Sequence, residues 1–276
     1  MTPQWHPVTK AVVLARGLGT RMRRDDPSAA LDAGQAAVAA QGVKAMIPIG
    51  RPFLDFALSA LADAGCTEVC LVIGPEHDQI REYFTRTSVP ERVRVSFAVQ
   101  AEPRGTADAL LSAEAFAAGD RVLMVNSDNY YPPHVLAALR AVPGSGVLGF
   151  ERDALIRESN IDAGRVVKFA LLALKFDGSL ARIVEKPDEA TARAMGGDAL
   201  VSMNAWVFTP AIFDACRRVT PSPRDELELQ DAVRIAVDEM GERFDVVRVA
   251  AGVLDLSSRG DIASVRERLA GVEPHP

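Results

Sequence analysis

The N-terminal part of the chain contains a short apolar run, residues 11–15 (AVVLA), that stops at Gly17 and Gly19. A continuous apolar run without polar alternation is typical of a strand buried on both faces, as in a parallel sheet covered by helices. Parallel neighbours cannot be joined by a tight hairpin and need crossover connections, which are usually helical. This run therefore predicts an α/β fold.

The residues that follow alternate between segments with helical spacing of apolar residues and strand-like apolar runs. Right-handed crossovers between such segments predict a Rossmann-like, three-layer α/β/α architecture with a mostly parallel mixed sheet. Helical spacing of apolar residues occupies 53–64, 76–84 and 106–117, and strand-like runs occupy 69–73, 93–99 and 122–125.

The second half of the chain has a different pattern. β-rich segments 166–175 and 180–185 flank Asp177-Gly178, a pair that favours a hairpin because it tolerates positive φ. No Gly/Ser-rich or Pro-rich linker separates the halves, so we expect one domain over residues 1–276, with halves 8–150 and 151–270. Further strands are expected over 203–208 and 244–249, and helices over 210–217, 226–240 and 262–269.

The charge balance restricts the partners. The chain has 31 Lys and Arg against 37 Asp and Glu, a net charge of −6, with no Lys/Arg-rich run, which disfavours nucleic-acid and anionic-membrane binding. Residues 1–10 lack an apolar signal-peptide core, and no run of about 18 apolar residues occurs. We therefore expect a cytoplasmic protein with no nucleic-acid or membrane partner.

The cysteines and histidines exclude other kinds of site. Cys66, Cys70 and Cys216 cannot form a disulfide framework and are expected to be buried small apolar side chains. The four histidines are scattered among turns and termini, so neither a zinc site nor a Ser-His-Asp triad is expected.

The first candidate for chemistry is the glycine loop, residues 14–22 (LARGLGTRM). Glycines after a buried strand let the backbone approach a ligand and direct N–H groups at phosphate, and Thr20-Arg21 adds a hydroxyl and a forked cation. The loop matches neither standard phosphate motif, because Met22 stands where the dinucleotide fingerprint needs glycine and a Walker Gly-Lys-Ser/Thr is absent.

Two further motifs follow predicted strands. Gln100 comes before Gly105-Thr106, where the amide can read a base edge and Thr106 is expected to be the N-cap of the next helix. Asp128 follows the strand predicted over 122–125, and Asp255 ends a late strand segment. Ligands bind at such strand ends in open α/β sheets, so the two carboxylates could share one Mg²⁺.

Taken together, the motifs resemble those of the nucleoside-diphosphate-sugar pyrophosphorylases, the sugar-1-phosphate nucleotidyltransferase family that includes glucose-1-phosphate thymidylyl- and uridylyltransferases. The resemblance runs from about residue 9 to residue 269. It rests on the glycine loop, Lys44-Ala45-Met46-Ile47-Pro48-Ile49, Gln100 with Gly105-Thr106-Ala107-Asp108-Ala109, Asp128, Glu185-Lys186-Pro187, Asn204 before Trp206-Val207-Phe208, residues 224–229 (RDELEL) and Gly252-Val253-Leu254-Asp255.

This resemblance implies Mg²⁺-dependent transfer of a nucleoside monophosphate from an NTP, with dTTP or UTP favoured, to a sugar 1-phosphate, which gives an NDP-sugar and pyrophosphate. It makes 8–150 the nucleotide-binding half and 151–270 the sugar-phosphate-binding half of one nucleotidyltransferase domain. The implied residues are Arg21, Lys44 and Lys186 for phosphate and catalysis; Leu14, Ala15, Gly17, Gly19, Thr20, Gln100, Gly105 and Thr106 for the nucleotide; Glu185 and Asn204 for the sugar; and Asp128 and Asp255 for Mg²⁺.

Three features depart from the family pattern. Arg16 stands where a small residue is usual, and it either alters base or ribose contact or points to solvent. Residues 25–42 form an Ala-rich insertion, interpreted either as a surface loop or as a lid over the nucleotide. Ser127 replaces the glycine that usually precedes the aspartate.

Three alternatives stay open. The chain could be a catalytically silent relative that senses a nucleotide or a sugar phosphate, or a cytidylyltransferase for a phosphorylated alcohol such as phosphocholine. The third alternative is a glycosyltransferase; such an enzyme would normally show Asp-x-Asp, whereas residues 128–130 are Asp-Asn-Tyr. The sequence leaves open the base, the sugar and whether the chain is a homo-oligomer.

Overall fold

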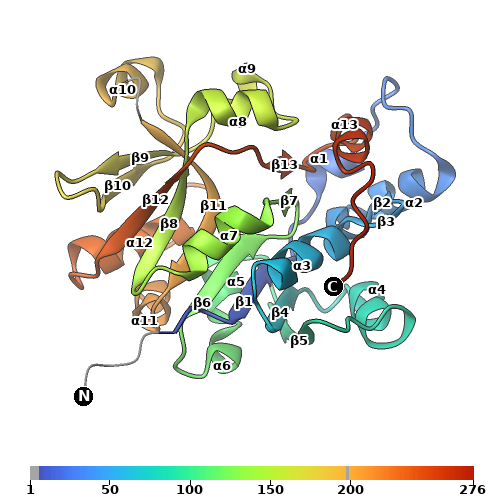
Figure 1. The fold of residues 1–276 in the computed structure, drawn as a ribbon, viewed down its shortest axis with the longest axis horizontal. Helices are drawn as coiled ribbons and strands as arrows, with labels where there is room; N and C mark the ends of the chain where they lie inside the picture. Colours follow the sequence, from blue (N-terminus) through green and yellow to red (C-terminus); the bar gives the residue numbers. More distant parts are fainter. Residues whose placement is uncertain (1–5, 197–198) are drawn as a thin grey trace.

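A nine-stranded mixed sheet forms the centre of the protein (Figure 1). The structure is a computed structural model that describes residues 6–196 and 199–276. The strand order is β10-β9-β11-β6-β1-β4-β5, with β8 paired to β11 and β12 paired to β8. Residues 1–5, part of the segment assessed above for a signal peptide, lie outside the described residues.

The N-terminal half supplies parallel strands. Strand β1 lies between β4 and β6, and β5 is parallel to β4 at the edge. Ala11, Val12 and Val13 are fully buried, as the apolar run predicts. The strands are β1 Lys10–Leu14, β4 Glu68–Ile73, β5 Arg94–Val99 and β6 Val122–Asn126.

The C-terminal half adds mainly antiparallel strands. Strand β11 is antiparallel to β6, β8 and β9, and the expected hairpin joins β9 to β10 through Gly178 at φ 77°. The predicted α/β fold with a mixed sheet is confirmed, with parallel pairing concentrated in the N-terminal half. The strands are β8 Ser145–Phe150, β9 Leu171–Leu174, β10 Leu180–Val184, β11 Leu200–Phe208 and β12 Phe244–Val249.

Helices cover both faces of the sheet, because alternate residues of the central strands enter different cores. Val13 belongs to the core under α3 (Phe53–Asp63) and α7 (Pro133–Arg140), whereas its neighbour Val12 belongs to the core under the second set of helices. That set is α5 Thr106–Leu111, α6 Glu114–Ala117, α11 Ala211–Arg217 and α12 Leu229–Asp238.

A third core lies beside the sheet, under α1 (Thr20–Arg23), α2 (Ala33–Gln41) and α13 (Asp261–Arg268). The insertion belongs to it: Asp32 and Gln35 form a reciprocal capping box at the start of α2, and Ala39 is fully buried. The remaining short elements are η1 Lys44–Met46, β2 Pro48–Ile49, β3 Arg51–Pro52, β7 Asn129–Tyr130 and β13 Leu254–Asp255.

Several predicted boundaries are wrong. The strand expected over 166–175 begins at Leu171, because Asp162 caps a short helix, α9 (Ala163–Val166). The helix expected over 106–117 is divided into α5 and α6. The helix expected over 76–84 is α4 (Asp78–Glu82) followed by a π-helical turn, Tyr83–Thr87. Strand β8 and the helices α7, α8 (Arg152–Glu158) and α10 (Glu189–Ala194) were not predicted.

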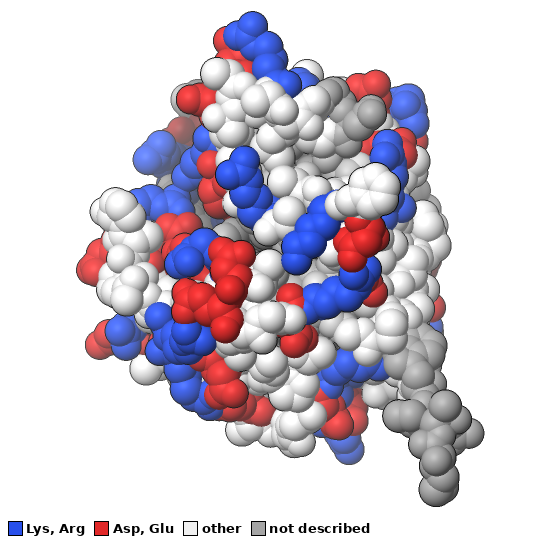
Figure 2. All heavy atoms as spheres, turned by 90° about the vertical axis from the view of Figure 1, so that its left-hand side faces the viewer, with Lys and Arg blue, Asp and Glu red and all other residues white. Residues whose placement is uncertain are grey.

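The surface agrees with the balanced composition. On the face drawn in Figure 2, basic and acidic side chains are interspersed rather than separated into large patches of one sign. Within residues 6–196 and 199–276, no helix has both the length and the apolar character needed to cross a membrane.

The three cysteine thiols should resist modification in the native protein. All three are buried, and burial raises the pKa of Cys66 and Cys70 to about 11 and that of Cys216 to about 12. Because the thiolate is the reactive form, we expect no reaction with a disulfide reagent at pH 8 and three reactive thiols after unfolding. Rapid reaction of the native protein in a colorimetric thiol assay would contradict this assignment.

Candidate active site

The glycine loop opens into a cavity of about 480 Å³ at the carboxyl ends of β1 and β6. All eight residues predicted to bind the nucleotide line this cavity, whereas Glu185, Lys186, Asn204 and Asp255, predicted for the acceptor and the metal, do not. The predicted residues that line it are Leu14, Ala15, Gly17, Gly19, Thr20, Arg21, Lys44, Gln100, Gly105, Thr106 and Asp128.

The insertion supports the glycine loop from outside the cavity. Gly19 has φ 60°, and a Cβ there would lie 2.0 Å from the carbonyl oxygen of Gly42, so only glycine fits against the end of α2. None of residues 25–42 lines the cavity. By contrast, Gly17 has open space beside it.

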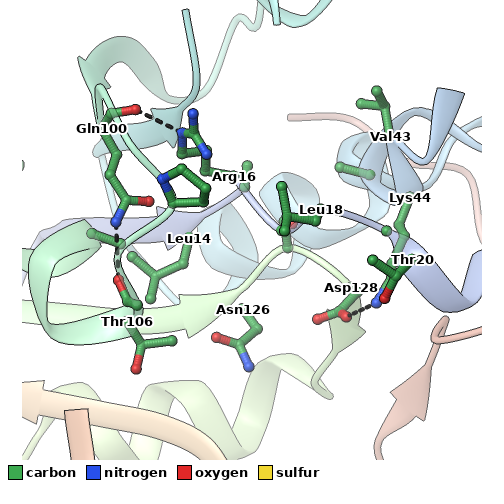
Figure 3. Close-up of a pocket in the computed structure, with 18 of the residues that line it drawn as sticks. Leu14, Arg16, Leu18, Thr20, Val43, Lys44, Gln100, Thr106, Asn126 and Asp128 are labelled. Carbon is green, nitrogen blue, oxygen red and sulfur yellow. Dashed lines mark hydrogen bonds and ion pairs between the residues drawn. The ribbon is translucent and has the colours of Figure 1, made fainter. Parts of the chain in front are cut away.

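Gln100 lies at one end of the cavity and is nearly fully buried (Figure 3). Its Nε2 donates to the carbonyl oxygen of Gly105 at 3.0 Å and to Oδ2 of Asp108 at 2.8 Å. Because both amide hydrogens are used, the side chain offers only its Oε1 acceptor to a ligand.

The role predicted for Thr106 as an N-cap is wrong. Gly105 occupies the N-cap position of α5, and Thr106 Oγ1 instead accepts from the backbone N–H of Leu229 at 2.9 Å. The backbone N–H of Ala107 also donates to Leu227. These bonds attach segment 224–229 to the cavity wall, and Glu226 of that segment lines the cavity.

The opposite end of the cavity carries charge. Lys44 Nζ lies 2.8 Å from Asp128 Oδ2, and Figure 3 shows this pair on the far side of the view from Gln100. The short pairing of β7 with β13 sets Asn129 opposite Asp255, and Leu256 N donates to the carbonyl oxygen of Asp128 at 2.8 Å. The two carboxylates predicted to bind metal are therefore neighbours.

Asp255 is enclosed by polar partners. Its carboxylate accepts from Asn129 Nδ2 and Ser257 Oγ, each at 3.1 Å, and pairs with Arg165. Burial raises the pKa of Asp255 to about 6, and repulsion from the Asp128 carboxylate adds to the shift. Arg165 also pairs with Asp261 at 2.5 Å.

This pair of carboxylates suits a hard divalent cation. Aspartate oxygens are the ligands that Mg²⁺ prefers, and a cation between them would relieve their mutual repulsion. Within the described part of the chain, no three His, Cys, Asp or Glu side chains form a complete metal cage. The remaining ligands of such an ion would be phosphate oxygens and water.

Glu185, Lys186 and Asn204 form a second group near segment 224–229. Lys186 and Asn204 have φ of 43° and 58°, which is uncommon for non-glycine residues and concentrates at functional sites. Gln230 Nε2 donates to Asn204 Oδ1 at 3.3 Å, and the Gln230 side chain also lies near the Glu185 carboxyl group. Although Glu185 is exposed at the surface, desolvation of its carboxyl group and repulsion from Glu228 raise its pKa.

Comparison with known proteins identifies the family. The model of the nucleotidyl transferase family matches residues 10–264. The chain belongs to this family. The UTP–glucose-1-phosphate uridylyltransferase AglF of Haloferax volcanii is 27% identical over 264 residues, 94% of this chain and 96% of that protein. A glucose-1-phosphate thymidylyltransferase of Streptomyces griseus is 30% identical over 230 residues, 83% of this chain and 57% of that protein.

The nucleotidyl transferase fold is also found among solved structures. A UDP-glucose pyrophosphorylase in complex with UDP-glucose superimposes with a TM-score of 0.75, covering 96% of this chain and 100% of that one at 19% identity. The family resemblance inferred from the motifs is confirmed, and this nucleotidyltransferase has the expected α/β fold.

Two residues of this nucleotidyltransferase were missed by sequence reasoning. Arg165 lies just before the segment 166–175 that was predicted to be a strand, and no motif marks it as the partner of Asp255. Gln230 lay in a predicted helix, directly after the Arg-Asp-Glu-Leu-Glu-Leu motif. Both act through contacts with residues distant in the sequence, for which no local pattern gave a signal.

Proposed function

We propose that the protein transfers a nucleoside monophosphate from UTP or dTTP to a sugar 1-phosphate and releases pyrophosphate. The observation that carries this proposal is one cavity with a base-reading amide, Gln100, at one end and the Lys44–Asp128 pair at the other (Figure 3). A nucleoside triphosphate has a matching arrangement, with a neutral base at one end and a charged polyphosphate at the other.

The acceptor presented by Gln100 favours uracil and thymine. Their N3 atom carries a hydrogen that can be donated to Oε1, whereas N3 of cytosine is itself an acceptor and would face Oε1 unpaired. This supports UTP or dTTP over CTP. It therefore weighs against the cytidylyltransferase alternative.

Transfer requires the phosphate oxygen of the sugar phosphate to attack the α-phosphorus in line with the leaving pyrophosphate, so catalysis depends on positioning and charge neutralisation. We assign the leaving phosphates to Arg21 and the reacting phosphate region to Lys44, both of which line the cavity. Asp128 and Asp255 would hold Mg²⁺. When bound, the ion draws the phosphates together and stabilises charge on the α-phosphate and the leaving group.

The second group is assigned to the acceptor. Lys186 would bind the phosphate of the sugar, and Glu185 and Asn204 would bind its hydroxyls. Gln230 supports this assignment because it donates to Asn204 Oδ1, which leaves the Asn204 Nδ2 donor for a sugar hydroxyl. A sugar with a hydroxyl in the wrong orientation would leave one of these groups unpaired.

Replacing Lys186 with Ala should affect the acceptor more than the nucleotide. We expect KM for the sugar 1-phosphate to rise by about 10-fold or more, because a charged contact is lost, while KM for the NTP changes less than about threefold. Steady-state kinetics with each substrate varied in turn would measure this. Lys175→Ala, which removes an exposed lysine in the β9–β10 hairpin, is the control. An equal loss for both substrates would refute the assignment.

The reaction itself is tested by pyrophosphate release with Mg²⁺. ATP, GTP, CTP, UTP and dTTP would each be paired with several sugar 1-phosphates and with phosphocholine. We expect release that requires UTP or dTTP together with one sugar 1-phosphate. Release with CTP and phosphocholine would establish the rival cytidylyltransferase, and triphosphate binding without release in any pair would indicate a silent nucleotide-binding relative.

A further inference from the structure

Arg16 is the residue of the glycine loop that departs from the small residue usual at its position. Its side chain does not point to solvent, since the residue is only 8% exposed and lines the nucleotide cavity. A buried guanidinium always carries its charge, so its surroundings must compensate for the water that it loses.

One edge of the guanidinium is fixed by the protein. Nε donates to the carbonyl oxygen of Gln100 at 2.7 Å, and Nη2 donates to that of Ala101 at 3.1 Å. Nη2 also lies 3.4 Å from Glu76 Oε2. Arg16 therefore attaches the glycine loop to the end of β5, the strand end that carries the base-reading amide.

The remaining nitrogen of Arg16 is unpaired. Nη1 is buried and has no hydrogen-bond partner among the residues that the structure describes. Leaving a buried donor of a charged group unpaired is costly, and native proteins rarely do so without a functional reason. Because Nη1 is closed to solvent in the ligand-free structure, an acceptor on a ligand in the cavity would satisfy it once the guanidinium or its surroundings shift to admit that acceptor.

The position of Arg16 indicates which part of a nucleotide supplies that acceptor. Figure 3 shows Arg16 beside Gln100 and on the other side of the view from Lys44 and Asp128. The Nη1 donor is thus at the base end of the cavity rather than the polyphosphate end. Together, Gln100 Oε1 and Arg16 Nη1 offer an acceptor and a donor, which complement the adjacent N3–H and carbonyl groups of uracil or thymine.

We propose that Arg16 is a specificity-determining residue, whose Nη1 donates to a ring carbonyl oxygen of the bound pyrimidine next to the N3–H that Gln100 accepts. The inference rests on the proposed use of UTP or dTTP. It adds a charged donor to base recognition in this chain, and the same guanidinium holds the backbone of Gln100 in place.

The test is calorimetric binding of UTP, 2-thio-UTP and 4-thio-UTP to the wild type and to Arg16→Met. Sulfur is a weaker acceptor than oxygen, so the wild type should bind one of the two thio analogues about tenfold more weakly than UTP. Arg16→Met should bind UTP about tenfold more weakly than the wild type and should no longer distinguish that analogue from UTP. If Arg16→Met weakened UTP and both analogues by one common factor, Arg16 would only hold the end of β5, and the inference would be overturned.

Matched controls separate base contact from general damage. Arg140→Met removes another guanidinium that binds main-chain carbonyl oxygens, those of Val8 and Ala64, away from the cavity, and should leave UTP binding unchanged. Inorganic triphosphate should bind Arg16→Met as it binds the wild type. If thermal melting shows that Arg16→Met does not fold, Arg16→Lys replaces it, because an ammonium cannot hold both carbonyls and the base.

The outcome is separable from that of the proposed function. If the wild type distinguishes a thio analogue from UTP and Arg16→Met does not, but the wild type releases no pyrophosphate with any sugar 1-phosphate, the role of Arg16 is supported and the proposed reaction is refuted. A wild type that binds only purine triphosphates, or that binds UTP and both thio analogues equally, would overturn the inference.

Discussion

Replacing Asp128 with Asn is expected to reduce kcat for pyrophosphate release by a factor of about 10³ or more. The substitution keeps the size of the side chain but removes the charge that pairs with Lys44 at 2.8 Å and that faces Asp255. It would leave one carboxylate where the proposed metal site needs two. Lys44 would then lack its counter-ion in the reacting phosphate region.

The chain contains a matched control for this substitution. Lys10 and Asp120 form a similar pair at 2.7 Å outside the cavity, with the Asp120 side chain 66% exposed. Asp120→Asn should leave kcat within about twofold, because exposed ion pairs contribute little. Melting temperatures of both variants would establish that they fold.

A metal readout distinguishes the proposed role of Asp128 from general damage. Mn²⁺ binding, followed by electron paramagnetic resonance in the presence of UTP, should weaken in Asp128→Asn and stay unchanged in Asp120→Asn. Wild-type turnover and wild-type Mn²⁺ binding in Asp128→Asn would remove Asp128 from the metal site.

The parallel half of the fold was predictable because its evidence is local. Each central strand is a run of apolar residues, and burial on both faces needs no partner to be specified in advance. Strand β8 (SGVLGF) was missed because it contains two glycines, which normally weaken a strand. The reason for them is tertiary: a Cβ at Gly149 would lie 2.7 Å from the Leu200 side chain, and one at Gly146 would lie 3.0 Å from the Asp245 carbonyl oxygen.

The cavity was predictable for a similar reason. The glycine loop, Gln100 and Asp128 each follow a strand that ends at the same edge of the sheet, so sequence position alone brings them together. What sequence position could not give is how each side chain is held. Arg16 bonds across 84 residues to Gln100, and Arg165 bonds across 90 residues to Asp255. Such pairs depend on how the loops pack.

The mutation Gly105→Ala is expected to destabilise the protein by about 2–4 kcal/mol and to weaken UTP binding by at least about tenfold. Gly105 has φ 117° and ψ 177°, a conformation available almost only to glycine. A Cβ there would lie 2.4 Å from the carbonyl oxygen and 2.6 Å from the nitrogen of Leu227, so main chain must move. Since Gln100 Nε2 donates to the Gly105 carbonyl oxygen, the movement would displace the base-reading amide.

Gly119→Ala isolates the steric part of this effect. Gly119 also has positive φ, 84°, but a Cβ there would meet nothing within 4 Å. The control should therefore cost only the backbone strain, about 1 kcal/mol, and leave UTP binding intact. Urea unfolding and calorimetry on both variants would measure the difference. If both variants lost the same free energy of unfolding and both bound UTP normally, contact with Leu227 would not hold the 100–105 segment. The base-reading end of the cavity would then tolerate a movement of the main chain that the observed packing forbids.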